Sequence, residues 1–354
     1  MSLTMPVVEI SFRDVNDVSN LNNGKSVALI LESTSAGTPA KNPLIVKEVG
    51  DIPTSVSAAN KTQIVNALIG ATNKPSKVVC YFKVTTETDY TNAKAALEKE
   101  TWDWLAIPGI AAADVASITT WIGDLRDDDI FVKAVLPMAA SDKEYIVNFA
   151  TDDIVVGSET YTTAQYCSRI AGLLAGTPLT ESATYTQLTE VTDCERFSKA
   201  DMDTAVAAGK FIIFHDGTKV KTGRGVNSLT TGTSDDMRKI KIIDVMDSIR
   251  IDLKKVVEDQ FIGRYQNTYD NKVVLLAALG EYFDKLVMDG VIAKKYEKGI
   301  DISAQTQYLR EKGVDTTGMT EQKIIEADTG SNVYFYAKVK IADAIEDIYI
   351  AIQD

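Results

Sequence analysis

Histidine is almost absent from this 354-residue sequence, in which His215 is the only imidazole. That scarcity excludes a metal site built from several histidines of one chain and leaves at most one histidine as a general base. Cysteine is also scarce, because Cys80, Cys167 and Cys194 are the only three and lie far apart in the sequence. Neither a disulfide framework nor a zinc-ligand spacing is present, so a reducing compartment is the simpler interpretation.

Positive charge is in deficit as well. The 37 lysine and arginine residues against 50 aspartate and glutamate residues give 37 − 50 = −13. A chain of that charge repels phosphate groups, so we expect neither a nucleic-acid partner nor a membrane partner. The longest apolar runs, such as Ser26–Leu31 and Val273–Leu279, fall well short of the roughly 20 residues that span a bilayer. We expect no secretory leader either.

The overall composition is ordinary for a globular protein. Hydrophobic residues make up 45% of the sequence, aromatic residues 8% and charged residues 25%. These proportions argue against disorder, a collagen-like repeat or a disulfide scaffold. At roughly 150 residues per domain, the length predicts two domains or one large α/β domain with an elaboration.

The N-terminal residues have the pattern of a single strand followed by a tether. Within Val7–Arg13, the side chains of Val8, Ile10 and Phe12 fall on one face and polar side chains fall on the other. The next stretch, Asp14–Lys25, is polar and shows no apolar period. We therefore expect residues 1–25 to form an arm and a linker.

Short apolar runs alternate with helical stretches over residues 26–208, which predicts a central α/β domain. The expected strands are Val27–Glu32, Lys77–Val84, Trp102–Pro108, Ile130–Pro137, Asp153–Val156 and a run near Gln187–Thr192. The expected helices are Thr62–Ile69, Asp89–Lys99, Ala112–Arg126, Thr163–Ala175 and Lys199–Ala208, the last with Ser198 as its N-cap. Strands buried on both faces that alternate with helices are typical of a mostly parallel sheet flanked by helices.

The pattern changes near residue 209, which predicts a second, α+β domain over residues 209–344. Its expected elements are the strand Lys210–Phe214, a hairpin partner at Lys219–Lys221, a helix from Ser234 to about Val257, a helix over Lys272–Met288 and a strand over Val333–Ile341. Asp216 and Gly217 form the dipeptide that favours the hairpin turn.

The last residues form a second strand at a chain end. Within Ile345–Ile352, the side chains of Ile348, Ile350 and Ile352 alternate with other residues. We expect residues 345–354 to be a C-terminal arm.

Two motifs could carry catalysis or a metal. His215 beside Asp216 could be half of a catalytic triad, but neighbours on a strand point to opposite faces, so a structural role is favoured. No serine lies in the Gly-x-Ser-x-Gly motif of a nucleophile elbow. The acidic run Asp127–Asp129 lacks the glycine and distal glutamate of a calcium loop, so a solvated helix end is favoured. We expect no catalytic residue, no metal site and no cofactor.

Three basic residues stand close together at the expected start of the first long C-terminal helix. They are Arg238, Lys239 and Lys241. Acidic residues alternate with the basic ones further along, so one interpretation is a mixed, exposed face. The other is a cationic face that meets an acidic partner.

Four segments together resemble one family, the contractile tail sheath proteins. Arg224–Thr231, Lys239–Ile249 and Phe261–Arg264 resemble the C-terminal part of these proteins, and Arg169–Pro178 resembles the helix that ends their central domain. These segments lie in the expected order between roughly residues 160 and 290.

The resemblance implies a structural subunit without catalysis. Such subunits polymerise helically around a tail tube in a bacteriophage, a phage-tail-like bacteriocin or a related particle, and they contract to drive the tube through a cell envelope. The implied partners are identical subunits, a tail tube protein, and baseplate and tail terminator proteins. The implied place of assembly is the cytoplasm of the host bacterium, and the implied central fold is subtilisin-like.

The resemblance also gives roles to the two arms and to the basic residues. Sheath subunits of the family exchange terminal strands, so Val7–Arg13 and Ile345–Ile352 are expected to link subunits. A net charge of −13 would repel an acidic tube, so we expect Arg238, Lys239 and Lys241 to contact it.

Two other classes of function remain open. A non-contractile shell or scaffold protein could share the terminal arms. An α/β nucleotide-binding enzyme could share the alternating strands, but it needs a glycine-rich turn after the first strand, which Leu31–Gly37 supplies poorly.

Overall fold

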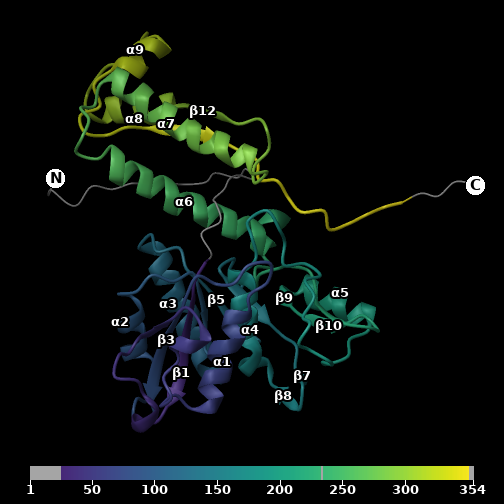
Figure 1. Ribbon diagram of the computed structural model, residues 1–354. Coiled ribbons are helices and arrows are strands. Elements are labelled where there is room, and N and C mark those ends of the chain that lie inside the picture. Colours follow the sequence, from purple (N-terminus) through teal and green to yellow (C-terminus); the bar gives the residue numbers. More distant parts are fainter. Residues whose placement is uncertain (1–24, 233, 351–354) are drawn as a thin grey trace, which may run out of the picture. The chain divides into compact units, whose positions relative to one another are not determined.

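The computed structural model describes residues 25–232 and 234–350, which fall into two compact units (Figure 1). The central unit contains the described residues up to Ile243 together with Ala344–Ile350, and the C-terminal unit contains Asp244–Asp343. Each unit is described by itself below.

A seven-stranded sheet forms the core of the central unit, with the order β2-β3-β1-β4-β5-β6-β9. The strands are β1 (Val27–Ser33), β2 (Leu44–Val46), β3 (Val78–Val84), β4 (Trp104–Ala106), β5 (Lys133–Pro137), β6 (Ile146–Phe149) and β9 (Lys210–Phe211). Neighbouring strands run parallel except at one edge, where β2 is antiparallel to β3. The expected mostly parallel sheet is confirmed.

Helices cover both faces of this sheet. On one face lie α1 (Ala58–Ile69) and α4 (Thr163–Ala175), and on the other lie α2 (Thr91–Leu97) and α3 (Val115–Asp127) (Figure 1). Strand β1 shows that the sheet buries hydrophobic side chains on both of its faces. Val27, Leu29 and Leu31 pack in one hydrophobic cluster, and Ala28 and Ile30 pack in the other. Such a strand reads as a continuous apolar run because both of its faces are buried.

Smaller elements complete the central unit. They are η1 (Ser35–Gly37), η2 (Val49–Asp51), η3 (Ala112–Asp114), β7 (Ile154–Val156), β8 (Glu159–Tyr161), α5 (Lys199–Ala207), β10 (Ile213–His215), β11 (Val220–Thr222) and η4 (Asp235–Arg238). Ser198 caps α5 as expected, since its side chain accepts from the backbone N–H of Asp201. The hairpin β10–β11 is also confirmed, and Gly217 takes a φ of 106° in its turn.

Two expectations about this unit change. The boundary expected at residues 208/209 moves to residue 243, because β9 pairs with β6 and extends the central sheet. The run near Gln187–Thr192 forms no strand and makes only the isolated bridge from Gln187 to Lys221.

The C-terminal unit combines helices with a two-stranded sheet. Helix α6 (Ile240–Gln260) begins in the central unit and continues into this one, followed by α7 (Tyr269–Met288), β12 (Glu297–Ile300), α8 (Ile302–Glu311), α9 (Glu321–Glu326) and β13 (Phe335–Lys338). Side chains of α6, α7 and the last strand region form its core, among them Ile249, Phe283, Leu286 and Val339. Strand β13 is shorter than the expected strand over Val333–Ile341, and α8, α9 and β12 were not foreseen.

The long helix expected from Ser234 begins later than predicted. Ser234 caps the 3₁₀ helix η4, and Lys239 then adopts an extended conformation before α6 begins at Ile240. The cause is tertiary, because Lys239 pairs with Val226 in an isolated bridge. Across residues 25–232 and 234–350, no helix has both the length and the apolarity to cross a membrane.

Candidate functional site

The structure describes only part of the two expected linking strands. Val8, Ile10 and Phe12 lie outside the described residues, as does Ile352. Ile348 and Ile350 are described, and they lie in a segment that we call the C-terminal arm, residues 344–350. Their role between subunits stays a prediction.

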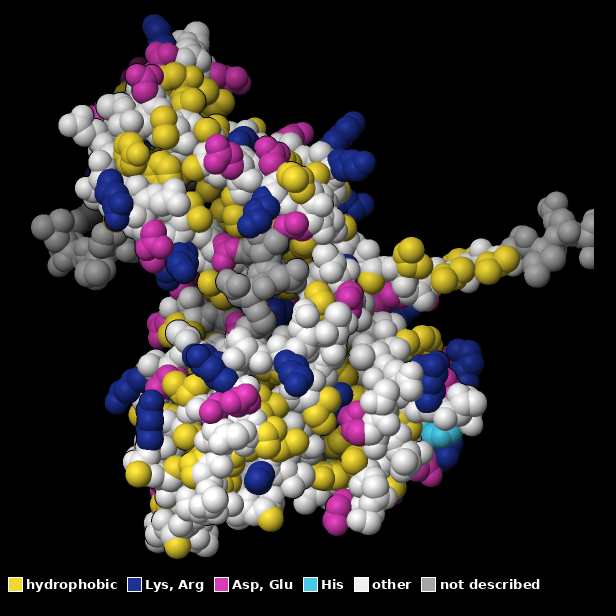
Figure 2. Space-filling view, viewed as in Figure 1, with side chains coloured by type: hydrophobic (Ala, Val, Ile, Leu, Met, Phe, Trp, Pro, Cys, Tyr) yellow, Lys and Arg dark blue, Asp and Glu magenta, His cyan; other side chains and the backbone are white. Residues whose placement is uncertain are grey.

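The C-terminal arm is extended and exposed. It contains neither helix nor strand, and the described part of the chain offers residues 345–350 no backbone hydrogen bond. The side chains of Ile345, Ile348, Tyr349 and Ile350 are 87%, 72%, 94% and 79% exposed. Figure 1 shows the arm in yellow as a trace without an arrow, and Figure 2 shows apolar side chains along it. Such a row of exposed apolar side chains and unpaired backbone is a template for pairing with another chain.

The base of the arm, in contrast, is fixed to the central unit by one carboxylate. Glu346 Oε1 accepts hydrogen bonds from Ser182 Oγ at 2.8 Å and from Thr184 Oγ1 at 2.6 Å. Arg224 lies on the other side, with its Nε 3.5 Å from Glu346 Oε2. Its Nη2 also donates to Asp347 Oδ1 at 2.6 Å, which lowers the pKa of Asp347. We call these five residues the arm clamp.

The two hydroxyl donors of the arm clamp, Ser182 and Thr184, belong to a loop that is hydrogen-bonded to the segment directly after β11. Thr184 Oγ1 also accepts from the backbone N–H of Gly225 at 2.9 Å, and Tyr185 N–H donates to the carbonyl of Gly223 at 3.2 Å. An open groove of about 430 Å³ runs between this loop and residues 344–346. Hydroxyl groups line it, since Thr72, Ser182, Thr184 and Thr186 all contribute.

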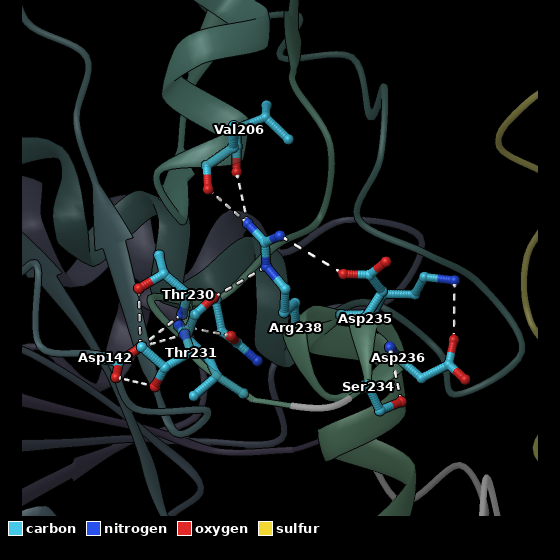
Figure 3. Close-up of polar contacts among 12 residues, drawn as sticks. Asp142, Val206, Thr230, Thr231, Ser234, Asp235, Asp236 and Arg238 are labelled. Atoms are coloured by element: carbon cyan, nitrogen blue, oxygen red, sulfur yellow. Dashed lines mark hydrogen bonds and ion pairs between the residues drawn. The ribbon is translucent and has the colours of Figure 1, made fainter.

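Arg238 is the centre of a polar network within the central unit (Figure 3). Its Nε donates to the carbonyl of Leu229 at 3.1 Å, and its Nη2 donates to those of Val206 at 3.3 Å and Ala207 at 2.7 Å. Nη1 lies 3.7 Å from Asp235 Oδ1. The guanidinium therefore ties the end of α5 to the segment that leads into α6.

The other two expected tube-contact residues also have partners in the central unit. Lys239 Nζ lies 3.4 Å from Asp236 Oδ1. Lys241 Nζ donates to the carbonyl of Thr180 at 3.2 Å, and Lys241 is only 7% exposed. The structure thus separates the three: Lys241 is on α6, whereas Arg238 is in η4 and Lys239 lies between them. Their contact with a tube stays a prediction.

A second polar network fixes the loop before η4. Asp142 Oδ1 accepts from the backbone N–H groups of Thr230 at 2.7 Å and Thr231 at 2.9 Å (Figure 3). The hydroxyl of Thr231 donates to the other carboxylate oxygen. These bonds, led by the one from the Thr231 hydroxyl, hold the pKa of Asp142 well below its usual range.

The residues that could have served catalysis or metal binding have local roles. His215 Nδ1 accepts from the backbone N–H of Gly217 at 2.9 Å, and Asp216 binds Lys221 at 2.5 Å within the hairpin. Hydrogen bonding to Lys221 lowers the pKa of Asp216. The run Asp127–Asp129 ends α3, where Asp129 takes a φ of 62°. In the described ranges, no three carboxylate, thiol or imidazole groups gather as metal ligands.

The cysteines are buried free thiols. Burial raises the pKa of Cys194 to about 11 and raises those of Cys80 and Cys167 further. A raised thiol pKa disfavours the thiolate, so these groups are poor nucleophiles at neutral pH.

The arm clamp is the feature that sequence reasoning missed. Arg224 opens one of the segments that carry the family resemblance, and Glu346 and Asp347 stand inside the expected C-terminal arm. The only signal was an acidic pair in an otherwise apolar strand. Its partner lies more than 120 residues upstream, since Arg224 and Asp347 are 123 positions apart.

Comparison with known proteins finds one family. Residues 83–228 match the phage tail sheath protein central domain, and residues 233–353 match the phage tail sheath C-terminal domain. A tail sheath protein of Clostridium phage phiCD119 is 35% identical over 336 residues, which cover 92% of each chain. The phage-like element PBSX protein XkdK of Bacillus subtilis is 29% identical over 184 residues, 49% of this chain and 39% of its own.

Solved structures share the fold. The sheath tail protein from Desulfitobacterium hafniense matches with a TM-score of 0.68 at 19% identity, over 83% of this chain and 94% of its own. The helical sheath of the anti-feeding prophage in its contracted state matches with a TM-score of 0.71 at 13% identity, over 99% of both chains.

Proposed function

Because this chain belongs to the phage tail sheath family and is a structural subunit of a contractile tail sheath, we propose that it polymerises around a tail tube by exchanging terminal strands between subunits. The observation that carries the proposal is the C-terminal arm, with unpaired backbone over residues 345–350 and four highly exposed apolar side chains. Main-chain hydrogen bonds formed by an added strand give affinity, and alternate side chains give register.

The two-stranded sheet of the C-terminal unit is a suitable acceptor. Strands β12 and β13 pair with each other, and no third described strand joins them. A sheet of two strands is marginally stable alone, and its outer edges carry backbone groups that an added strand can pair. We propose that the arm of a neighbouring subunit adds to one of these edges.

Contraction in this proposal is a rearrangement of packed subunits and uses no chemical fuel. Strand pairs act as hinges while the two units rotate as rigid bodies toward a lower-energy packing. The relatives are structural proteins. His215 accepts a hydrogen bond from Gly217 within the hairpin turn. We propose on these grounds that the chain is not an enzyme.

The remaining partners follow from the same premise. We propose a tail tube protein inside the polymer, baseplate and tail terminator proteins at its ends, and assembly in the cytoplasm of the host bacterium. A related solved structure is the anti-feeding prophage baseplate, which matches with a TM-score of 0.68 at 12% identity. The chain itself belongs to a phage tail or a phage-tail-like particle.

The test of strand exchange is a change in the arm alone. We expect Ile348→Ser with Ile350→Ser to leave a folded subunit that no longer polymerises, because both side chains are exposed in the isolated subunit and only a neighbour would bury them. Electron microscopy and sedimentation measure the polymer, and the thermal midpoint measures the fold.

The matched control is Ile348→Val with Ile350→Val, which keeps the strand propensity and most of the apolar surface. This variant should polymerise as the parent does. If the serine variant instead unfolds at a much lower temperature, the arm belongs to the core of its own subunit and the proposal is wrong.

A further inference from the structure

We propose that Arg224, Ser182 and Thr184 are positioning residues that fix the direction and the rotation of the C-terminal arm relative to the central unit. The inference rests on the proposed strand exchange, and it assigns the arm clamp a role in that exchange. A linking strand is useful to a helical polymer only if every subunit presents it in the same direction.

The burial pattern separates a fixed base from a projecting strand. The side chain of Glu346 is only 9% exposed, whereas its neighbour Ile345 is 87% exposed. A carboxylate is costly to bury unless it is hydrogen-bonded. The carboxylate of Glu346 accepts hydrogen bonds from the hydroxyl groups of Ser182 and Thr184 and lies next to the guanidinium of Arg224. The base of the arm is therefore held at one defined point.

Arg224 also fixes rotation about the axis of the arm. Successive side chains of an extended chain point to opposite sides, yet one guanidinium reaches both Glu346, at 3.5 Å, and Asp347, at 2.6 Å. A group that contacts two successive residues cannot keep both contacts if the segment turns about its axis. The clamp thereby decides which way Ile348 and Ile350, further along the same segment, face.

The two hydroxyl groups that bind Glu346 are held in place by hydrogen bonds within the central unit. Thr184 Oγ1 accepts from Gly225 N–H, Ser182 Oγ accepts from Thr184 N–H at 3.2 Å, and the fully buried Thr222 donates to the carbonyl of Ala183 at 2.6 Å. These bonds do not involve the arm, so the donors are held in place whether or not the arm is bound. Preorganised donors reduce the entropy lost when a segment is ordered.

The consequence concerns motion of the subunit. The residues before the arm, up to Asp343, belong to the C-terminal unit, whereas the arm is clamped to the central unit. An arm fixed in this way moves with the central unit. A neighbour that holds the strand is then coupled to the central unit of the donor subunit.

The direct test measures the arm in the isolated subunit. Spin labels are placed at Tyr349→Cys, in the exposed arm, and at Lys61→Cys, an exposed position of α1. The native cysteines are buried and should not react. We expect a narrow distance distribution in the parent and at least a twofold broader one with Arg224→Ala. An unchanged width in Arg224→Ala would overturn the proposal.

Polymerisation gives the second measurement. We expect Arg224→Ala to raise the critical concentration for polymerisation about tenfold. Arg224→Lys keeps the positive charge but loses the planar guanidinium that contacts two carboxylates, so we expect a smaller increase. Arg196→Ala is the matched control, because Arg196 forms an exposed ion pair with Asp193 at 2.8 Å in the same unit and should change nothing. All variants should keep the parent thermal midpoint within a few degrees.

The outcomes distinguish this inference from strand exchange itself. If Arg224→Ala polymerises like the parent while the Ile348→Ser, Ile350→Ser variant does not, only the clamp proposal is wrong. If the serine variant also polymerises normally, strand exchange by this arm is wrong. If Arg224→Ala fails to fold, the double variant Ser182→Ala, Thr184→Val is measured in its place. It removes the two hydroxyl donors to Glu346 without changing the charge.

Discussion

The pKa values of the carboxylates in this protein differ widely because their surroundings differ. Asp142 and Asp216 accept several hydrogen bonds each, and their pKa values lie well below the usual range. Asp252 on α6 is the opposite case, because burial raises its pKa to about 6 against the hydrogen bond from Tyr282 and the charges of Lys255 and Lys285. The two kinds of carboxylate have opposite effects on stability as pH changes.

Asp252→Asn should stabilise the C-terminal unit at neutral pH. The folded pKa of Asp252 is about 6 and the unfolded value is 3.8. The folded state therefore binds the extra proton, and stability falls as pH rises from about 4 to 6. Asparagine removes that penalty, so the gain should appear above pH 6 and disappear near pH 4. Thermal unfolding at several pH values measures it.

The control for this substitution is Asp259→Asn. Asp259 lies on the same helix and is exposed. Its substitution therefore removes one negative charge from the helix but relieves no burial of a carboxylate. An equal gain in both variants would show that burial of Asp252 is not the cause.

At the scale of elements, two helices on one face of the central sheet pack closely against each other. Gly172 of α4 faces α1, and a Cβ atom at this position would lie 2.1 Å from the carbonyl oxygen of Ala67. Backbone cannot move aside as a flexible side chain can. The absence of a side chain at Gly172 is what lets α1 and α4 pack together over the sheet.

Gly172→Ala should therefore destabilise the protein although alanine is the better helix former. Overpacking costs about 1–3 kcal/mol, and the gain in helix propensity of about 1 kcal/mol offsets only part of it. Urea denaturation measures the change in the free energy of unfolding. Gly280→Ala in α7 is the control, because the atoms nearest to its Cβ would belong to the flexible end of the Lys298 side chain, which can move aside. A loss as large in the control would argue against a specific contact between α1 and α4.

At the scale of the whole molecule, charge and connectivity set how subunits can assemble. A net charge of −13 makes subunits repel one another and an acidic tube, so docking needs local cations. Arg238 and Lys241 already serve the fold of their own subunit, through carbonyls of other segments. The Nζ of Lys239 lies 3.4 Å from Asp236 Oδ1 in the adjacent turn.

The tube contact is therefore best tested with Lys239→Glu before the triple charge reversal. We expect sheath that polymerises without tube, or tails that contract prematurely, because the cationic contact with the tube is lost. Exposed ion pairs are worth only about 0–1 kcal/mol each, which suits a contact that must break along the whole tube. Electron microscopy of assembled tails measures the outcome.

Lys199→Glu is the control, since the side chain of Lys199 is 84% exposed and pairs with Asp203 in its own helix. Normal extended tails with Lys239→Glu, and again with the triple reversal of Arg238, Lys239 and Lys241, would place the tube contact elsewhere. The mixed face would then be the better interpretation of these residues.

The sequence by itself determined what depends on near neighbours. Alternating apolar runs, the cap at Ser198, the Asp216-Gly217 turn and the helices at Thr163–Ala175 and Lys272–Met288 were all predicted, because strand and helix periods and caps are local properties. The family was visible in the same way, from short segments such as Arg224–Thr231.

Only the tertiary structure decided which distant segments meet. It joined β9 to β6, which moved the boundary from residue 208 to residue 243, and it bridged Lys239 to Val226, which delayed the start of α6. It also brought Arg224 to Glu346 and Asp347. No local pattern encodes such pairs, since they form only when the folded core has fixed the positions of both segments.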